Sequence, residues 1–313
     1  MALLLFGRKG MGECRLCPRE CGVDRKKGRM GVCKVAGEGI IAARAALHQW
    51  EEPCISGKNG SGAVFFSGCP LGCVYCQNYD IARGQAGKRI SKERLAEIFL
   101  ELQEKKAANI NLVTPTHYTP EITQAVERAR NQGLSIPVVY NCSGYEKTET
   151  LRSLEGIVDV YLTDFKYMDS EAASRYSQAA DYPQVAMAAL AEMVRQTENQ
   201  AGHGGMALFD EEGNMKKGVI VRHLLLPGHL KNAKAVVKYV YETYGDRVFL
   251  SLMNQYTPLP QSEKWPEINR KVTRREYERL VEYALFLGVE NGFIQEGETA
   301  KESFIPAFDG EGL

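Results

Sequence analysis

Three cysteines set close together, Cys69, Cys73 and Cys76, are the strongest chemical signal in the sequence, and their spacing is C-x3-C-x2-C. A closed zinc site or an electron-transfer cluster normally takes four protein ligands. A cluster of four irons held by three thiolates keeps one iron free for an outside ligand. The spacing therefore predicts an iron–sulfur cluster whose open iron takes part in chemistry.

The cysteines follow an apolar run at residues 63–67, which predicts a short buried strand that Gly68 and Pro70 break into a loop. This places them at the carboxyl end of a strand, where parallel α/β folds bind their ligands. A zinc knuckle completed by a distant residue is the alternative. The cluster is favoured because zinc motifs usually come as paired C-x2-C units.

The triad, with Tyr75 directly before its third cysteine, resembles the signature of the radical S-adenosylmethionine (SAM) enzymes. The resemblance implies a [4Fe-4S] cluster on the three cysteines, with SAM bound to the free iron and Tyr75 beside it. It also implies an oxidoreductase that cleaves SAM to methionine and a 5′-deoxyadenosyl radical, which abstracts hydrogen from a substrate. A reduced ferredoxin or flavodoxin would supply the electron.

Strand-like and helical stretches alternate after the triad. Apolar, β-branched runs predict strands at 109–113, 137–140, 158–163, 218–226 and 247–253. Helical patterns lie between them, at 92–106, 121–132, 182–197 and 231–244. The order is β-α repeated about six times, which a doubly wound open sheet would fit equally well. The triad after the first strand favours a partial (β/α)6 barrel, the fold of the radical SAM enzymes.

Three regions follow from this pattern, with the barrel assigned to residues 61–260. Residues 1–60 are rich in Cys, Gly, Arg and Lys and predict a small irregular segment that a metal orders. Residues 261–313 form a C-terminal extension, with a helix at 273–287 and a tail. A polar stretch at 200–216 predicts a loop or hairpin inserted before the fifth strand.

The barrel region is similar, more narrowly, to the activating enzymes of glycyl-radical systems, typified by the pyruvate formate-lyase activating enzyme. That family has a Gly-Gly-Glu turn that contacts the amino group of SAM, and this chain has Thr114-Pro-Thr-His117. The resemblance implies that the hydroxyls of Thr114 and Thr116 accept the amino group's hydrogen bonds, without a carboxylate. The Thr-Pro-Thr-His turn in place of Gly-Gly-Glu, together with the N-terminal cysteines and the C-terminal tail, resembles an uncharacterised branch of the family.

Two further strand ends match the family in part. The segment beginning at Asn141 and including Ser143 corresponds to the family's Asp-Thr-Asn-Gly, and Asp164 and Lys166 correspond to its Asp-Leu-Lys. The resemblance implies SAM contacts here, with Lys166 as counter-charge to the SAM carboxylate. It also implies a monovalent cation site, which the loss of one carboxylate at Asn141 weakens. Arg222 matches an arginine that contacts SAM.

A purely structural interpretation of these charges stays open. Asp164 and Lys166 would then form an ion pair at a strand end, and Arg222 would be a surface charge.

A second group of cysteines lies near the N-terminus, at Cys14, Cys17, Cys21 and Cys33. Neighbouring arginines and lysines would offset the charge of an anionic thiolate cluster. Zinc and a second iron–sulfur cluster both accept four thiolates, and the spacing does not choose between them. A structural metal is favoured because the ligands lie outside the barrel, and unligated cysteines are the alternative.

Composition limits the classes of function. Lys and Arg number 39, as do Asp and Glu, so net charge predicts neither nucleic-acid nor membrane-surface binding. No segment reaches the ~18 apolar residues of a membrane span, and the apolar start is too short for a signal peptide. Nine cysteines in such a chain indicate metal or redox chemistry and a cytoplasmic protein.

The substrate stays open at this level. A barrel of six strands leaves a lateral opening that suits a peptide or protein loop, so installation of a glycyl radical on a partner protein is the leading hypothesis. Radical modification of another protein, peptide or metabolite is the second. A non-catalytic iron–sulfur or zinc protein, which would bind no SAM, is the third.

Overall fold

The computed structural model describes residues 13–201, 206–295 and 305–313. Its centre is one sheet in which seven strands run parallel, in the order β10-β9-β8-β6-β5-β4-β2. These strands are β2 (Ser61–Phe66), β4 (Ile110–Val113), β5 (Val138–Cys142), β6 (Val160–Asp164), β8 (Met215–Leu224), β9 (Phe249–Met253) and β10 (Gly292–Ile294).

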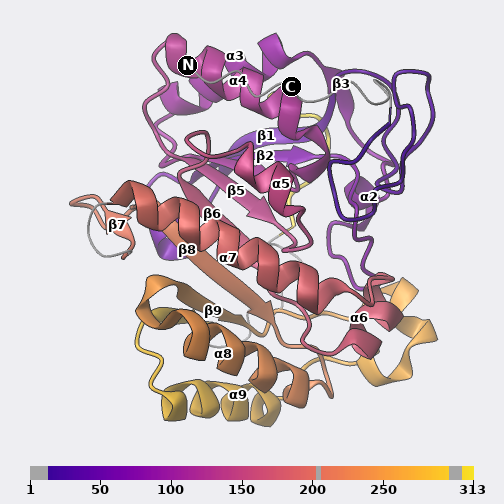
Figure 1. Cartoon of the computed structure of the whole chain (residues 1–313), viewed down its shortest axis with the longest axis vertical. Helices are drawn as coiled ribbons and strands as arrows, with labels where there is room; N and C mark the ends of the chain where they lie inside the picture. The colour runs from indigo at the N-terminus through magenta and orange to yellow at the C-terminus, as the bar shows by residue number, and fades with distance from the viewer. Residues whose placement is uncertain (1–12, 202–205, 296–304) are drawn as a thin grey trace.

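Helices connect the parallel strands and cover one face of the sheet (Figure 1). They are α3 (Lys92–Glu104), α4 (Thr119–Asn131), α5 (Thr148–Arg152), α6 (Ser170–Ser177), α7 (Tyr182–Ala201), α8 (Leu230–Tyr244) and α9 (Arg274–Leu287). The partial (β/α)6 barrel is confirmed, and each strand and helix predicted between residues 63 and 287 is present. Shorter 3₁₀ turns are η1 (Thr116–Tyr118), η2 (Gly245–Arg247), η3 (Pro260–Lys264) and η4 (Pro266–Ile268).

Sequence periodicity explains how the two faces of the sheet are filled. On β6, Tyr161 packs into the core shared with the helices, whereas Val160 and Leu162 point to the opposite, inner face. Helix α4 buries Ile122 and Ala129, seven residues apart and therefore on one side of the helix. Because the long helices cover the other face, the inner face is left to bind ligands at the strand ends.

Strand β1 (Ile40–His48) was not foreseen, because it lies in the segment expected to be irregular. It pairs antiparallel with β2 and with β3 (Lys88–Ile90), and so extends the main sheet. The C-terminal tail runs beside it, since Gly310 N donates to Ala43 O at 3.0 Å and Ala45 N donates to Glu311 O at 2.9 Å.

The chain between β1 and β2 enters the inner face of the sheet. Its short helix α1 (Pro53–Ser56) places Ile55 against Val139 and Val160. The Ile55 carbonyl accepts a hydrogen bond from Asn109 Nδ2 at 2.7 Å. This segment therefore fills the interior of the barrel below the strand ends.

The polar insertion contains β7 (Leu208–Phe209), which pairs antiparallel with β8 as a hairpin would. Residues 202–205 of that insertion lie outside the described part of the chain. No helix within the described residues has the length and apolar character needed to cross a membrane.

Candidate active site

The cysteine triad lies in the loop between β2 and α2 (Tyr79–Ala82), at the carboxyl end of β2 as predicted. Gly68 starts the loop with a φ of +93°, and a Cβ there would lie 2.6 Å from the carbonyl oxygen of Cys33. Only glycine fits this conformation and this close approach. The next residue, Cys69, donates its backbone N–H to the same Cys33 oxygen at 3.1 Å. The loop is thus pinned to the N-terminal segment.

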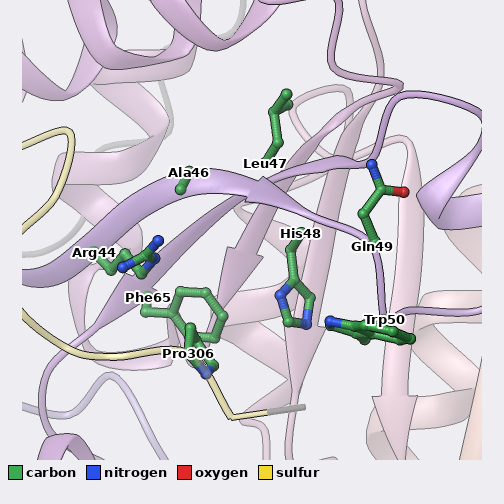
Figure 2. A pocket seen from close by; sticks show the side chains of 8 residues that line it. All are labelled: Arg44, Ala46, Leu47, His48, Gln49, Trp50, Phe65 and Pro306. Atoms are coloured by element: carbon green, nitrogen blue, oxygen red, sulfur yellow. The ribbon is translucent and has the colours of Figure 1, made fainter. Parts of the chain in front are cut away.

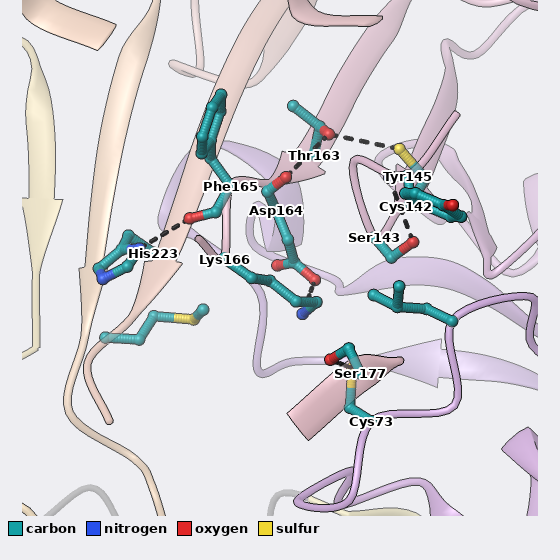
Figure 3. Close-up of polar contacts among 12 residues, drawn as sticks. Cys73, Cys142, Ser143, Tyr145, Thr163, Asp164, Phe165, Lys166, Ser177 and His223 are labelled. Atoms are coloured by element: carbon teal, nitrogen blue, oxygen red, sulfur yellow. Dashed lines mark hydrogen bonds and ion pairs between the residues drawn. The ribbon is translucent and has the colours of Figure 1, made fainter. Parts of the chain in front are cut away.

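The three thiols share one environment, in which Cys73 is buried and Cys69 and Cys76 are half-buried. Burial, together with the charges of the neighbouring cysteines, raises the pKa of Cys69 to about 11 and that of Cys76 to about 12. Two donors face the sulfurs: Ser177 Oγ lies 3.0 Å from Cys73 Sγ, and Leu71 N lies 3.4 Å from Cys69 Sγ. Figure 3 shows the first of these contacts.

Lys166 supplies a partly buried cation to this site. Its Nζ lies 2.5 Å from Asp164 Oδ2, so the ion pair allowed by the structural interpretation is formed (Figure 3). Burial alone would lower the pKa of Lys166, but Asp164 and the Cys73 thiolate outweigh it, and the pKa is raised above its usual range. The ammonium therefore stays charged next to the thiols.

This donor set fits an iron–sulfur cluster. Three thiolates from one loop, two hydrogen-bond donors to sulfur and a neighbouring ammonium together stabilise a group with anionic ligands. In the described part of the chain, no three His, Cys, Asp or Glu side chains are arranged around one ion position. That statement applies equally to the triad and to the four N-terminal cysteines.

Tyr75 does not project freely beside the triad. It is buried, and its hydroxyl lies 2.6 Å from the hydroxyl of Tyr167. Tyr167 in turn lies 2.9 Å from Ser177 Oγ, which donates to Cys73. A line of hydroxyls thus leads from Tyr75 to a cluster ligand, which the spacing of the cysteines gave no means to predict.

The two threonines expected to contact SAM occupy different settings. Thr114 directly follows β4, has a φ of +60° and donates its backbone N–H to Asn141 O at 2.9 Å, so it lies on the strand-end rim. Thr116 is buried and donates its hydroxyl to Glu146 Oε1 at 2.8 Å. The Thr116 hydroxyl is therefore held by a carboxyl group that the sequence analysis did not single out.

Glu146 is wholly buried, and Tyr140 is its second donor at 3.2 Å. Burial raises the pKa of this carboxyl to about 8, although the hydrogen bond from Thr116 acts in the opposite direction.

Ser143 lies beside Asp164 at the same ends of the strands (Figure 3). Its Oγ accepts from Tyr145 N at 3.4 Å, and its carbonyl accepts from the Tyr182 hydroxyl at 2.8 Å. Tyr182 also donates to the carbonyl of Asp164 at 3.2 Å. One tyrosine therefore ties together two of the strand ends that the resemblance assigns to SAM.

Arg222 is paired inside the barrel rather than exposed. Its Nε donates to Glu52 Oε1 at 2.8 Å, and its Nη2 contacts both Glu51 and Glu52. Burial alone would lower the pKa of Arg222, but the two carboxylates outweigh it and raise the pKa. The interpretation of Arg222 as a surface charge is wrong, because the β1–β2 connection brings two carboxylates onto it.

Glu51 also links neighbouring strands of the barrel. It accepts from Asn111 Nδ2 on β4 at 2.8 Å and from Asn141 Nδ2 on β5 at 3.4 Å. The side chain of Asn141, expected beside SAM, is thereby turned toward the carboxylate. The sequence offered no signal for this contact, because Glu51 belongs to no motif and lies 90 residues away.

Two buried histidines near the strand ends are neutral. His117 Nε2 lies 2.9 Å from Ser67 O, and His223 Nδ1 lies 2.7 Å from Phe165 O. Burial lowers the pKa of each to about 4. Each ring donates a hydrogen bond to a backbone carbonyl, so both histidines stabilise the fold at the strand ends.

A pocket of about 200 Å³ opens beside β1, between that strand and the tail (Figure 2). Its lining includes Arg44, His48, Trp50, Phe65 and Pro306. Phe65 belongs to β2, the strand that leads into the triad, so the pocket approaches the inner face of the barrel from the side.

Comparison with known proteins bears directly on this site. Residues 63–212 match the model of the Radical SAM superfamily. The match includes the triad, Asp164 and Lys166, and it supports a radical SAM enzyme. A family that binds a [4Fe-4S] cluster and SAM agrees with the donor set around the cysteines.

Comparison with individual proteins does not identify the reaction or the substrate. The uncharacterized protein MJ0674 of Methanocaldococcus jannaschii is 29% identical over 279 residues, or 87% of this chain and 74% of that protein. SuiB of Streptococcus suis, solved with its precursor peptide SuiA, is 14% identical with a TM-score of 0.48 over 73% of this chain. The aligned region spans 46% of SuiB.

A domain of the pyruvate-formate lyase-activating enzyme from Bacteroides vulgatus is also similar. It is 14% identical with a TM-score of 0.39, over 61% of this chain and 100% of the domain. These structural likenesses are too weak to bear on the reaction or the substrate.

Proposed function

We propose that this protein uses a [4Fe-4S] cluster on Cys69, Cys73 and Cys76 to cleave SAM and to abstract a hydrogen atom from a polypeptide substrate. The observation that carries the proposal is the triad itself. It lies at the end of β2, inside the stretch that matches the Radical SAM model, with the Ser177 hydroxyl on the Cys73 sulfur and the Lys166 ammonium close enough to interact with the charges of Cys73 and Cys76. When bound, the reduced cluster supplies one electron that splits SAM into methionine and a 5′-deoxyadenosyl radical.

The chain's own residues bind and orient SAM in this proposal. Lys166, charged and partly buried near the thiols, faces the SAM carboxylate, and Asp164 holds its ammonium in place. On the rim formed by the strand ends, the Thr114 hydroxyl accepts a hydrogen bond from the SAM amino group, and Ser143 lies on the same rim. Holding the reacting carbon close to the target hydrogen and excluding water are the protein's contribution to the rate.

A polypeptide is the proposed substrate because the open edge of the barrel already holds an extended segment. The tail donates and accepts backbone hydrogen bonds along β1, and Phe308 packs edge-on against Phe65 with ring centroids 5.6 Å apart. Main-chain pairing at a sheet edge with side chains in adjacent pockets is a common mode of peptide recognition. The pocket beside Phe65 provides space for one such side chain.

Within this class, a glycyl-radical protein is the finer proposal for the substrate, and reduced ferredoxin or flavodoxin is the proposed donor. Both rest on the resemblance of the barrel region to the activating enzymes. A monovalent cation beside Asp164 stays a prediction of the same resemblance.

Anaerobic reconstitution tests the proposal. Reduced protein is expected to show a paramagnetic cluster signal that shifts on addition of SAM, and to release 5′-deoxyadenosine faster when a polypeptide substrate is present. Incubation with a glycyl-radical protein from the same cell should leave a persistent organic radical with a glycine doublet. Release of 5′-deoxyadenosine without that doublet would reject the activase and leave another polypeptide or metabolite as the substrate. A cluster signal unaffected by SAM, with no 5′-deoxyadenosine, would instead indicate a non-catalytic protein.

A further inference from the structure

The four N-terminal cysteines come together in the structure although the sequence separates Cys33 from the others. A Cβ on Gly31 would lie 3.2 Å from the sulfur of Cys33 and 3.6 Å from that of Cys21, so these two sulfurs face one small space. Cys14 lies beside the turn that follows Cys21, because its backbone N–H donates to Val23 O at 2.9 Å. Cys17, between them in the sequence, is buried.

Tight turns present these cysteines. Gly22 N donates to Cys14 O at 3.1 Å, and Glu20 N donates to Cys17 O at 3.0 Å. A second turn surrounds Cys33, because Lys34 N donates to Gly31 O at 3.0 Å. Short turns that bring four cysteines close together, in a segment with little apolar core of its own, are typical of thiolate-bound metal sites.

Arg19 joins this segment to the catalytic loop. It lies between Cys17 and Cys21, and its Nε donates to Pro70 O at 2.9 Å, inside the loop that carries the triad. Its Nη2 donates to Ser177 O at 3.0 Å, and Ser177 is the residue that donates to Cys73. One guanidinium therefore holds both the catalytic loop and the helix end that faces it.

The backbone makes a second connection. Cys69 N donates to Cys33 O at 3.1 Å, so a ligand of the triad and a member of the outer group are in direct contact. The segment is also fixed to the barrel, because Thr150 Oγ1 donates to Leu16 O at 2.8 Å and Arg25 Nη1 donates to His117 O at 2.9 Å. In Figure 1 this segment, drawn in indigo, lies beside α2, which follows the triad.

We propose that Cys14, Cys17, Cys21 and Cys33 bind a metal centre, either zinc or a second iron–sulfur cluster, and that this centre holds the triad loop in its cluster-binding conformation. Loss of the outer metal loosens residues 13–37, and the loosening reaches the triad through Arg19 and the Cys33 carbonyl. The inference rests on the proposed function in that the triad must itself hold a cluster.

The test compares metal content and cluster lability in four reconstituted proteins: wild type, Cys17→Ala, Arg19→Ala and Arg15→Ala. Arg15 is the matched control, since its side chain is 64% exposed and its ion pair is with Glu13 alone among the described residues. Iron and zinc are measured by elemental analysis, and release of iron from the triad to an iron chelator is followed by absorbance. Circular dichroism establishes that each variant is folded.

Cys17→Ala is expected to lose the outer metal, seen as zinc or as about half the iron, and to release triad iron roughly tenfold faster. Arg19→Ala is expected to keep the outer metal and still release triad iron faster, because it removes only the connection. Arg15→Ala should match wild type. If Cys17→Ala does not fold, Arg19→Ala still decides the coupling and the metal content of wild type still decides the site.

Two results would overturn the inference. Wild type that carries iron for the triad and no further metal would reject the outer site. Release of triad iron at the wild-type rate from Arg19→Ala would reject the coupling. Failure of the proposed function looks different: a Cys73→Ala variant would then retain all the iron of wild type, or wild type would bind no SAM.

Discussion

The hydroxyl of Ser177 donates a hydrogen bond to the sulfur of Cys73 across 3.0 Å, and both side chains are buried. Ser177 ends α6, and Cys73 lies in the loop after β2, so the contact joins two distant parts of the barrel. Hydrogen bonds to ligand sulfur help set the reduction potential of a cluster, because they stabilise the more negative, reduced form.

Ser177→Ala is therefore expected to lower the reduction potential of the triad cluster. If the hydrogen bond stabilises the reduced cluster by about 1 kcal/mol, its loss lowers the one-electron reduction potential by roughly 40 mV. A redox titration followed by electron paramagnetic resonance measures the shift. Tyr167→Phe removes the next hydroxyl in the line and keeps Ser177, so its shift should be smaller; a larger shift in Tyr167→Phe would argue against direct control by Ser177.

Arg222→Ala is expected to destabilise the fold. The variant leaves Glu51 and Glu52 buried without their cation, and breaking a buried pair in this way costs about 3–5 kcal/mol. Urea unfolding measures the free energy. Glu52→Gln in the Arg222→Ala background should recover part of the loss, because it removes one of the two uncompensated charges. Unchanged stability in Arg222→Ala would mean that the carboxylates find another partner.

Lys166→Met is expected to weaken SAM binding by about 1.5–3 kcal/mol, because it removes a charged donor from the proposed carboxylate site. Calorimetric titration measures the affinity, and iron content shows whether the cluster is kept. A Lys166→Met, Asp164→Asn double variant separates loss of the donor from the stranded Asp164 carboxylate. Lys216→Met, on the partly exposed β8 surface, is the control. Equal SAM affinity in wild type and both Lys166 variants would remove Lys166 from the site.

Glu146 makes stability depend on pH. Its folded-state pKa of about 8 lies above the unfolded value near 4.5, so the folded state binds more protons between these pH values. The stability it contributes is complete below pH 4.5 and is lost as pH rises toward 8. Wild type should therefore lose a few kcal/mol across this window relative to Glu146→Gln, which cannot ionise. Urea unfolding of both proteins at pH 5 and pH 8 measures this difference. An equal change in the free energy of unfolding in the two proteins would contradict the prediction.

Local patterns in the sequence predicted the helices, the strands and the triad. They could not predict contacts between residues that are far apart in the sequence. The run at 63–67 and the cysteine spacing suffice to place the triad, because strand, loop and ligands are contiguous. The pairing of Arg222 with Glu52 spans 170 positions and depends on the β1–β2 connection entering the barrel. Strand β1 was not predicted for a related reason. It is rich in alanine, a weak strand former, and its stability comes from pairing with β2.

The tail beside β1 leads to the last prediction, because a polypeptide substrate would compete with it. Phe308 contacts Phe65 and packs with the small core that includes Val113, and Arg44 forms ion pairs with Asp309 and Glu311. These ion pairs involve exposed carboxylates and contribute little, so the aromatic contact is the main anchor. Phe308→Ala should therefore loosen the tail without disturbing the triad.

With the tail loosened, a polypeptide substrate should bind the β1 edge more readily. The expected result is a KM a few fold lower for substrate-dependent release of 5′-deoxyadenosine, with kcat near the wild-type value. The matched control is Phe286→Ala on α9, whose side chain is 83% exposed. A raised KM in Phe308→Ala would show that the tail forms part of the binding surface instead. Identical kinetics in both variants would place the substrate elsewhere on the barrel.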